Sequence, residues 1–344
     1  MFLLKQIIQI GIISLLLPLN PVSVAATEQL QPILNQKDSS FVATFIAQNQ
    51  SAEELLEQGL DRLDQGDYQG AIEKYTQALE LNPDSAEAYH NRGLAYIRLQ
   101  QYESALADLN KAISLNPDNA GAYNSRGGVY VNLQQYKNAL ADLNKALELN
   151  PDYASAYNNR GFVYVSLQQY ESALANLNKA ISLNPDDAKA YHNRGLAYLG
   201  LQQYQNAIAD FNKTLELNPD SADAYNYRGR VYFSLQQYES ALADLNKALE
   251  LNPDSAEAYN YRGGAYLNLQ QYKNAIADFN KALELNPDNA EAYLGRSGYY
   301  YQMGKRENAI ADMEKAIQLF CQQGSSDACQ KAQEVLRLMQ TESQ

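Results

Sequence analysis

Apolar and small residues recur along most of this chain at the spacing of amphipathic helices. In the segment 86–119, Tyr89, Gly93 and Tyr96 are four and three residues apart, which places them on one face of a first helix. In the second half of the same segment, apolar residues recur at intervals of one and three residues and form a stripe on a second helix. The pattern therefore predicts a helix, a turn and a second helix.

This two-helix pattern returns with a fixed period of 34 residues. An Asn-Pro-Asp tripeptide follows the second helix in seven places, with its proline at Pro83, Pro117, Pro151, Pro185, Pro219, Pro253 and Pro287. The octapeptide YHNRGLAY at 89–96 likewise returns at 191–198, three periods later. Because proline ends a helix, we expect the aspartate after it, such as Asp84 or Asp118, to be the N-cap of the next helix.

Repetition of one short hairpin predicts an all-α solenoid. A single hairpin cannot bury its apolar side alone, so successive hairpins must stack on one another. Within a hairpin, a glycine of the first helix and an alanine of the second, such as Gly93 and Ala105, fall where the two helices cross. Glycine inside a helix costs about 1 kcal/mol relative to alanine, so its return in successive repeats indicates close approach of the helices.

The residues at these positions resemble the tetratricopeptide repeat (TPR), a 34-residue helical hairpin. Eight repeats match its spacing of aromatic, Gly, Tyr, Ala and Pro positions: 52–85, 86–119, 120–153, 154–187, 188–221, 222–255, 256–289 and 290–323. The departures are Tyr in place of the family's first Trp, Leu55 and Arg62 at the aromatic places of the first repeat, Thr214 for an alanine and Ser297 for a glycine. The resemblance implies an α-solenoid superhelix of eight helix-turn-helix repeats with a C-terminal capping helix. The amino-acid sequence of the repeats is also similar to that of cyanobacterial TPR proteins.

The first residues have the pattern of a secretory signal peptide. Lys5 precedes an apolar run of about a dozen residues, and Val24, Ala25 and Ala26 are small residues at the place of a cleavage site. The alternative is an uncleaved membrane anchor. We therefore expect a signal peptide at 1–26, a linker at 27–50 with a short helical turn at 41–47, repeats at 51–323, and a capping helix and tail at 324–344. The protein is expected to be exported to the periplasm, the thylakoid lumen or the medium.

Composition narrows the function further. The formal net charge of −13 argues against nucleic acid and anionic lipid as partners, so we expect membrane contact only through an uncleaved signal segment. Two His and two Cys leave few candidates for a catalyst based on these residues. His90 and His192 are three repeats apart and cannot share a metal ion. We expect no enzyme activity, no cofactor and no metal.

An arginine follows the first aromatic position in seven repeats, and an aspartate stands 16 residues after most of them. The arginines are Arg92, Arg126, Arg160, Arg194, Arg228, Arg262 and Arg296, and the aspartates are Asp108, Asp142, Asp210, Asp244, Asp278 and Asp312. The first repeat lacks both, and Asn176 stands opposite Arg160. This joint occurrence favours an Arg–Asp pair within each hairpin. A ladder of arginines that binds anions is the alternative.

In the TPR family the first helices line the inner curve of the superhelix, so the resemblance assigns a binding groove to their polar face. The candidate binding residues are His90, Asn91, Asn124, Asn158, Asn159, Phe162, His192, Asn193, Asn226, Tyr227, Arg230, Asn260 and Tyr261. An amide side chain has both a donor and an acceptor, so this ladder suits the backbone of an extended peptide. The alternative is that the amides only solvate the inner surface.

The last residues leave the 34-residue period. Ser325 or Ser326 is placed to cap a final helix, whose apolar residues are Ala328, Ala332, Val335, Leu336, Leu338 and Met339. This helix is expected to cover the apolar face of the last repeat. Cys321 and Cys329 flank the turn before it and are expected to form a disulfide, with two free thiols as the alternative.

Together these features predict a non-catalytic protein–protein interaction scaffold. We expect it to hold an extended peptide or protein segment in the concave groove of the TPR superhelix. The alternatives are an envelope glycan-binding protein, because Tyr- and Asn-lined grooves can hold sugars, and an assembly factor for a membrane complex such as those of photosynthesis.

Overall fold

The computed structural model describes residues 51–341, which fold into 17 helices without a strand. The predicted signal peptide and linker, with the helical turn at 41–47, lie outside these residues. The described chain divides into two compact units, one ending at Gln101 and the other beginning at Tyr102. We call them the N-terminal and C-terminal units and describe each by itself.

The N-terminal unit contains three helices, α4 (Ala52–Asp64), α5 (Tyr68–Leu81) and α6 (Ala86–Arg98). Helix α5 packs against both α4 and α6. A capping box begins α4, in which Ser51 accepts from the backbone N–H of Glu54 and the Glu54 carboxylate accepts from the N–H of Ser51. Tyr75, Ala71 and Ala95 lie in the buried interior of this unit.

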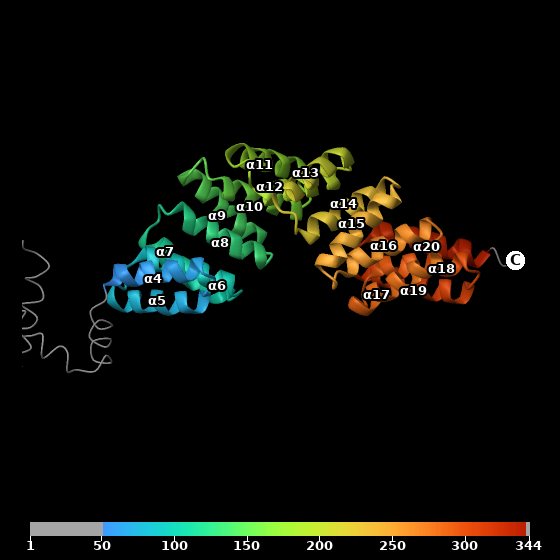
Figure 1. The fold of residues 1–344 in the computed structure, drawn as a ribbon, viewed down its shortest axis with the longest axis horizontal. Coiled ribbons are helices and arrows are strands. Elements are labelled where there is room, and N and C mark those ends of the chain that lie inside the picture. The colour runs from blue at the N-terminus through green and yellow to red at the C-terminus, as the bar shows by residue number, and fades with distance from the viewer. Residues whose placement is uncertain (1–50, 342–344) are drawn as a thin grey trace, which may run out of the picture. The chain divides into compact units, whose positions relative to one another are not determined.

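The C-terminal unit contains the remaining helices in antiparallel succession (Figure 1). They are α7 (Tyr102–Leu115), α8 (Ala120–Asn132), α9 (Tyr136–Leu149), α10 (Ala154–Ser166), α11 (Tyr170–Leu183), α12 (Ala188–Gly200), α13 (Tyr204–Leu217), α14 (Ala222–Ser234), α15 (Tyr238–Leu251), α16 (Ala256–Asn268), α17 (Tyr272–Leu285), α18 (Ala290–Gln302), α19 (Arg306–Gln322) and α20 (Ser326–Thr341). Each hairpin from α8–α9 to α18–α19 packs on the next, as in an all-α solenoid, which confirms the predicted fold class.

The prediction that aspartate caps the first helices was wrong by one residue. Ser85 Oγ accepts from the N–H of Ala88, and Asn119 Oδ1 accepts from the N–H of Ala122, so the residue after each aspartate is the N-cap. Asp84 belongs instead to the turn, where its own N–H donates to Asn82 Oδ1. The proline therefore starts a turn one residue longer than expected.

The predicted close approach within a hairpin is present, and a large side chain is its nearest contact. A Cβ built on Gly195 would lie 2.8 Å from the ring of Phe211, and one on Gly263 would lie 3.3 Å from the carbonyl oxygen of Ala275. The glycine therefore makes room for the Leu or Phe at the hairpin centre. Ser297 replaces it in the last repeat and donates to the carbonyl oxygen of Ala309 across 2.7 Å.

The predicted Arg–Asp pair is confirmed in the C-terminal unit. Arginine Nε and Nη2 donate to both carboxylate oxygens across 2.7–2.9 Å in Arg126–Asp142, Arg194–Asp210, Arg228–Asp244, Arg262–Asp278 and Arg296–Asp312. In α10–α11 the Nε of Arg160 donates to Asn176 Oδ1 instead. These bidentate bonds fix how the two helices of a hairpin align.

The arginines make a third bond that the sequence analysis missed. Their Nη1 atoms donate across 2.5–2.8 Å to an asparagine on the second helix of the preceding repeat, in Arg126–Asn110, Arg160–Asn144, Arg194–Asn178, Arg228–Asn212, Arg262–Asn246 and Arg296–Asn280. In the N-terminal unit Arg92 donates to Thr76 in the same way. We call the full set around one arginine the arginine clamp. It joins neighbouring repeats as well as the two helices of one hairpin.

The turn within each hairpin contains a residue in the left-handed conformation. Gln100, Gln134, Gln168, Gln202, Gln236 and Gln270 have φ between 56° and 60°. The equivalent residues of the first and last repeats are Gly66 and Gly304, for which positive φ is unstrained. Glutamine rarely adopts this conformation, so these six turns carry backbone strain.

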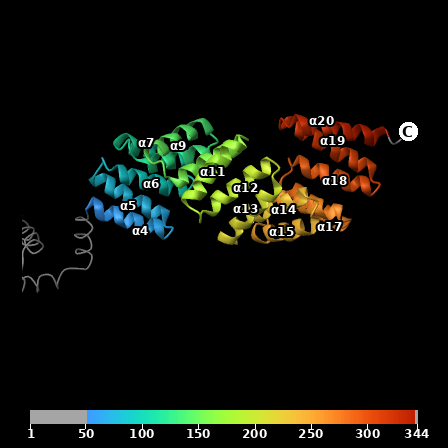
Figure 2. The ribbon, with the colours of Figure 1, turned by 90° about the horizontal axis from the view of Figure 1, so that it is seen from above.

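Helix α20 covers the end of the last hairpin, as predicted. Figure 2 shows it beside α19, where Ala332, Met339 and Cys329 are buried against Phe320 and Leu319. Val335 and Leu338, however, are 40% and 59% exposed, so their predicted place in this contact was wrong. The contact is made instead by Cys329, Ala332 and Met339, with Ala328 and Leu336 partly buried beside them.

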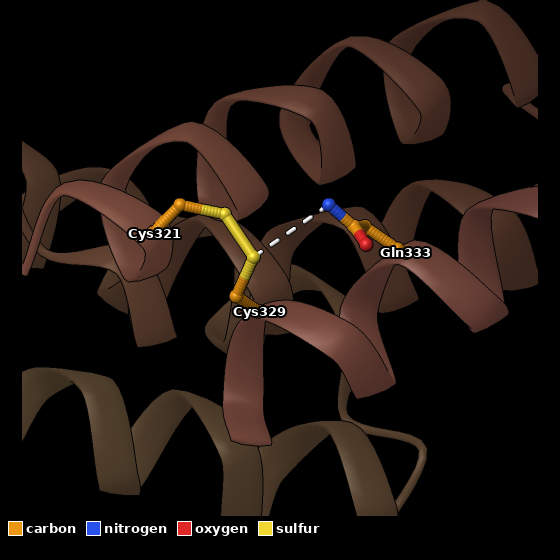
Figure 3. Close-up of a disulfide and its surroundings, with 3 residues drawn as sticks. All are labelled: Cys321, Cys329 and Gln333. Carbon is orange, nitrogen blue, oxygen red and sulfur yellow. Dashed lines mark hydrogen bonds between the residues drawn. A yellow bond between two sulfur atoms is a disulfide. The ribbon is translucent and has the colours of Figure 1, made fainter. Parts of the chain in front are cut away.

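A disulfide joins the end of α19 to the start of α20. It links Cys321 and Cys329, and Gln333 Nε2 donates to Cys329 Sγ across 3.6 Å (Figure 3). Cys321 is exposed, whereas Cys329 is buried. The bond therefore holds the capping helix on the last hairpin.

Candidate functional site

The first helices of the C-terminal unit lie next to one another and present the predicted binding residues. Contacts run from α8 to α10, α12, α14, α16 and α18 in order. We call the exposed side of these six helices the first-helix face. His90 and Asn91 lie on α6 in the N-terminal unit, where Asn91 is buried and burial lowers the pKa of His90.

Amides on the first half of this face bond to one another. Asn159 Nδ2 donates to Asn124 Oδ1, and Asn193 Nδ2 donates to Asn158 Oδ1, both across 2.9 Å. The predicted ladder is therefore present, but part of its hydrogen-bonding capacity is used between neighbouring helices. One Nδ2 hydrogen of Asn159 and one of Asn193 are therefore used between helices, while the second hydrogen and the Oδ1 atom of each remain for a ligand.

Three of the predicted amides on the first-helix face are also less accessible than expected. Asn158, Asn226 and Asn260 are 6–8% exposed. Their side chains lie between neighbouring first helices because that place in the repeat faces the next helix. They support the first-helix face, while Asn159 and Asn193 reach farther toward solvent.

Aromatic residues replace the amide ladder on α14 and α16. The ring of His192 lies 5.6 Å from that of Tyr227, and Tyr261 lies 5.6 Å from Phe233, with Arg230 5.3 Å from the centre of the Tyr261 ring. Burial raises the pKa of Tyr261 to about 12. These tyrosines are therefore neutral packing residues around physiological pH.

The hydrogen bond between amides of neighbouring first helices is missing at Asn226, where the amide ladder ends. Asn226 Oδ1 is buried and has no hydrogen-bond partner, because Tyr261 stands at the place from which Asn159 and Asn193 donate in earlier repeats. Its Nδ2 donates to Glu257 Oε2 across 3.4 Å, and Glu257 also pairs with Arg230 across 3.1 Å. On the second half of the face, Glu257 is therefore already bonded to Arg230 and to the Asn226 amide.

A pocket of about 360 Å³ opens between α10, α12 and the start of α14. It is lined by Asn158, Asn159, Phe162, Ala188, Lys189, His192, Asn193, Thr214, Asn218, Ser221 and Asp223. The structure brings five predicted binding residues together here, namely Asn158, Asn159, Phe162, His192 and Asn193. It does not bring Asn124, Asn226, Tyr227, Arg230, Asn260 or Tyr261 to the pocket wall.

Sequence reasoning missed part of this wall. Ser221 is the N-cap of α14, Asp223 lies in its first turn and Asn218 is the C-cap of α13, so all three lie at the junction between repeats rather than at the predicted binding positions. The sequence did offer a signal for Thr214, because this residue replaces the alanine found at the same place in other repeats. Its hydroxyl is buried and donates to the Asp210 carbonyl oxygen across 3.0 Å.

The charges at the pocket are few and opposite in sign. Lys189 and Asp223 are exposed on α12 and α14. Burial lowers the pKa of His192, and the Asp223 carboxylate opposes this shift only partly. His192 is therefore neutral at pH 7 and adds hydrogen-bonding capacity without charge.

The part of the chain that the structure describes shows neither a metal-binding cluster nor a membrane-spanning helix. Residues 51–341 contain no group of three His, Cys, Asp or Glu side chains arranged to hold a metal ion. Within the same residues, no helix combines the length and apolar character needed to cross a bilayer.

Comparison with protein families finds tetratricopeptide-repeat models along the chain. The model described as TPR repeat matches 59–100, 127–168, 163–202 and 229–270, and models described as Tetratricopeptide repeat match 86–119, 188–221, 256–289, 211–243 and 290–320. Together they cover 59–119 and 127–320, well over half of the sequence. A search of curated proteins found no match.

Solved structures with similar folds include several repeat proteins. A tetratricopeptide repeat protein from Parabacteroides merdae is 27% identical, with a TM-score of 0.54 over 69% of this chain and 94% of that one. Pseudomonas aeruginosa pilF is 22% identical, with a TM-score of 0.55 over 60% and 94% of the two chains. The APC/C hetero-tetramer Cut9–Hcn1 is 18% identical, with a TM-score of 0.64 over 77% and 52%.

The last two similarities show the fold alone. The family models, however, match the same 34-residue period, and the hairpins they match pack as the period predicted. Such repeats generally act as non-catalytic interaction scaffolds. This chain belongs to the tetratricopeptide-repeat family.

Proposed function

We propose that this protein is an exported, non-catalytic scaffold that binds an extended peptide or protein segment along the first-helix face of its C-terminal unit. The observation that carries the proposal is the pocket between α10, α12 and α14, because five of the predicted binding residues meet there. Its volume of about 360 Å³ falls in the range of sites that bind a ligand side chain or small molecule.

The arrangement around the pocket suits a chain better than a compact ligand. Asn159 and Asn193 stand at equivalent places of successive first helices, and Phe162 adds an apolar surface to the same pocket. An extended segment crossing these helices can place one side chain in the pocket and bond its backbone to the exposed amide atoms. Partner segments rich in acidic residues or phosphate are disfavoured by the negative net charge.

Export is part of the proposal and has separate support. Residues 1–26 have the signal-peptide pattern, and the Cys321–Cys329 disulfide suits an oxidising compartment. N-terminal sequencing of the protein from its native host tests this part. Cleavage after Ala26 and recovery in the envelope or the medium are expected, whereas an intact Met1 in the cytoplasm would contradict it.

Site-specific photo-crosslinking tests the binding face. The full chain carrying benzoylphenylalanine at Phe162 is irradiated with a random peptide library, and crosslinked peptides are read by mass spectrometry. Ala175, exposed on the second helix α11, is the matched control position. We expect crosslinking at Phe162 well above that at Ala175.

Variants then measure the contribution of the face to binding. For a peptide recovered in this way, Phe162→Ala should weaken binding by about tenfold or more, as is usual for an aromatic contact at the centre of an interface. Ala175→Ser should leave the Kd unchanged. Equal crosslinking at both positions, or a Kd insensitive to Phe162→Ala, would reject this face as the binding site.

A further inference from the structure

The hydrogen bonds of the amide ladder determine which atoms it can offer to a ligand. Asn159 and Asn193 each use Nδ2 to donate to the preceding first helix. Their Oδ1 atoms accept no hydrogen bond from any residue between 51 and 341. At the pocket Asn159 and Asn193 therefore present two amide oxygens in successive repeats, each with both lone pairs free and one Nδ2 hydrogen beside it.

The charged groups around these oxygens favour a ligand group that donates hydrogen bonds. Asp223 adds a carboxylate at the start of α14, and its side chain is exposed. His192 adds no positive charge, because burial lowers its pKa. Lys189 is the opposing charge, but it lies exposed at the start of α12, where its side chain is free to move into solvent.

The pocket also has an apolar side that a ligand can contact. Phe162 contributes an aromatic ring beside the amides. Arginine and lysine combine a long apolar stem, a donor-only head group and one positive charge, and both interact favourably with aromatic faces. A basic side chain can therefore meet the amide oxygens, the carboxylate and the aromatic ring of the pocket together.

We propose that this pocket recognises a basic side chain, arginine or lysine, of the bound segment. The acceptors are Asn159 Oδ1, Asn193 Oδ1 and the Asp223 carboxylate, with Phe162 beside the apolar stem. The proposal rests on the proposed function, because it names the partner chemistry of the same site.

Nuclear magnetic resonance with small probes tests the pocket directly. The full chain is titrated with Nα-acetyl-arginine amide, with the neutral isostere Nα-acetyl-citrulline amide, and with Nα-acetyl-glutamate amide. We expect the arginine probe to shift the side-chain amide signals of Asn159 and Asn193 with an affinity at least several-fold above that of citrulline. Equal shifts with citrulline, or stronger shifts with glutamate, would overturn the proposal.

Two variants with opposite expected effects on the affinity for arginine sharpen the test. Asp223→Asn should weaken arginine binding roughly fivefold, and Lys189→Gln should strengthen it by a similar factor, as expected for charges near solvent. Glu239→Gln, an exposed carboxylate on the second helix α15, is the control and should change nothing. An anionic ligand would reverse both signs and reject the basic class.

The two proposals fail in different ways. Peptides that crosslink at Phe162 without enrichment of Arg or Lys, and with affinity unaffected by Asp223→Asn, would leave the binding face in place and remove the basic side chain. Arginine probe binding without any peptide crosslinking would keep the pocket chemistry and reject the extended segment.

Discussion

The first hairpin and the α14–α15 hairpin of the C-terminal unit have helices of equal length but are held together differently. Helices α4 and α14 have 13 residues, and α5 and α15 have 14. The α14–α15 hairpin carries the arginine clamp of Arg228, whereas the first hairpin has Gln58 and Lys74 at the two places of the Arg–Asp pair. Its centre is filled by Tyr75, which is fully buried at the place that Leu245 takes in α14–α15.

The difference shows that the hairpin itself depends on apolar packing. The first hairpin forms the same structure without the Arg–Asp pair, so the pair is not needed to bring two helices together. The clamp also bonds to the preceding repeat, which the first repeat of the array lacks. We infer that the main role of the arginine clamp is to fix the alignment of one repeat on the previous one.

The largest effect is expected from breaking one clamp. Arg228→Ala leaves Asp244, whose side chain is 8% exposed, without its partner and removes the bond to Asn212, so it should destabilise α14–α15 by about 3 kcal/mol. Hydrogen exchange should be used because repeat arrays open locally. Arg62→Ala, in an exposed pair with Asp67, is the control and should cost less than about 1 kcal/mol. Equal losses would contradict the proposed role of the clamp.

Removing one hydroxyl should stabilise the first hairpin. Tyr75 OH is buried without a hydrogen-bond partner, so Tyr75→Phe should gain about 1–2 kcal/mol in urea unfolding at pH 7. Burial raises the pKa of Tyr75 to about 12 from 10, so the folded state holds this proton longer than the unfolded state. The Tyr75 contribution to stability should therefore fall as pH rises from 10 to 12, and the Phe variant should lack this component.

A smaller gain is expected from relieving one strained turn. Gln168 has φ of 58°, at the place where Gly66 and Gly304 stand in other repeats, so Gln168→Gly should stabilise α10–α11 by about 0.5–1 kcal/mol. Gln169→Gly is the matched control, because Gln169 has negative φ and gains nothing from glycine. A loss of thermal stability for Gln168→Gly would show that the turn carries no strain.

The smallest effect concerns the one hairpin of the C-terminal unit with Asn in place of Asp. Asn176→Asp should allow both oxygens to accept from Arg160, as Asp210 does from Arg194, with a gain of about 0.5 kcal/mol. The gain is small because the Asn176 bond to the Ser172 carbonyl oxygen is lost. Asp210→Asn is the reciprocal variant, and a gain there instead would contradict the comparison.

Much of the fold could be predicted because its signals are local. Helix spacing, the 34-residue period and the pairing of residues 16 apart all lie within one hairpin, so they could be read without knowing how hairpins stack. The turn prediction failed by one residue at Asp84 and Asp118, where the competition between two adjacent capping residues depends on backbone angles. Gly66 and Gly304 were available as a signal of the left-handed turn and were overlooked.

The candidate site could be predicted only in part. Helical periodicity alone places polar residues such as Asn159, His192 and Asn193 on one face of the first helices. Which amide atoms remain for a ligand follows from the stacking of separate hairpins, since Asn159 and Asn124 are 35 residues apart and meet only there. The same stacking brought Asp223, from the start of the next repeat, to the pocket wall. Contacts between repeats depend on the distance and rotation between neighbouring hairpins, which no periodicity within one repeat specifies.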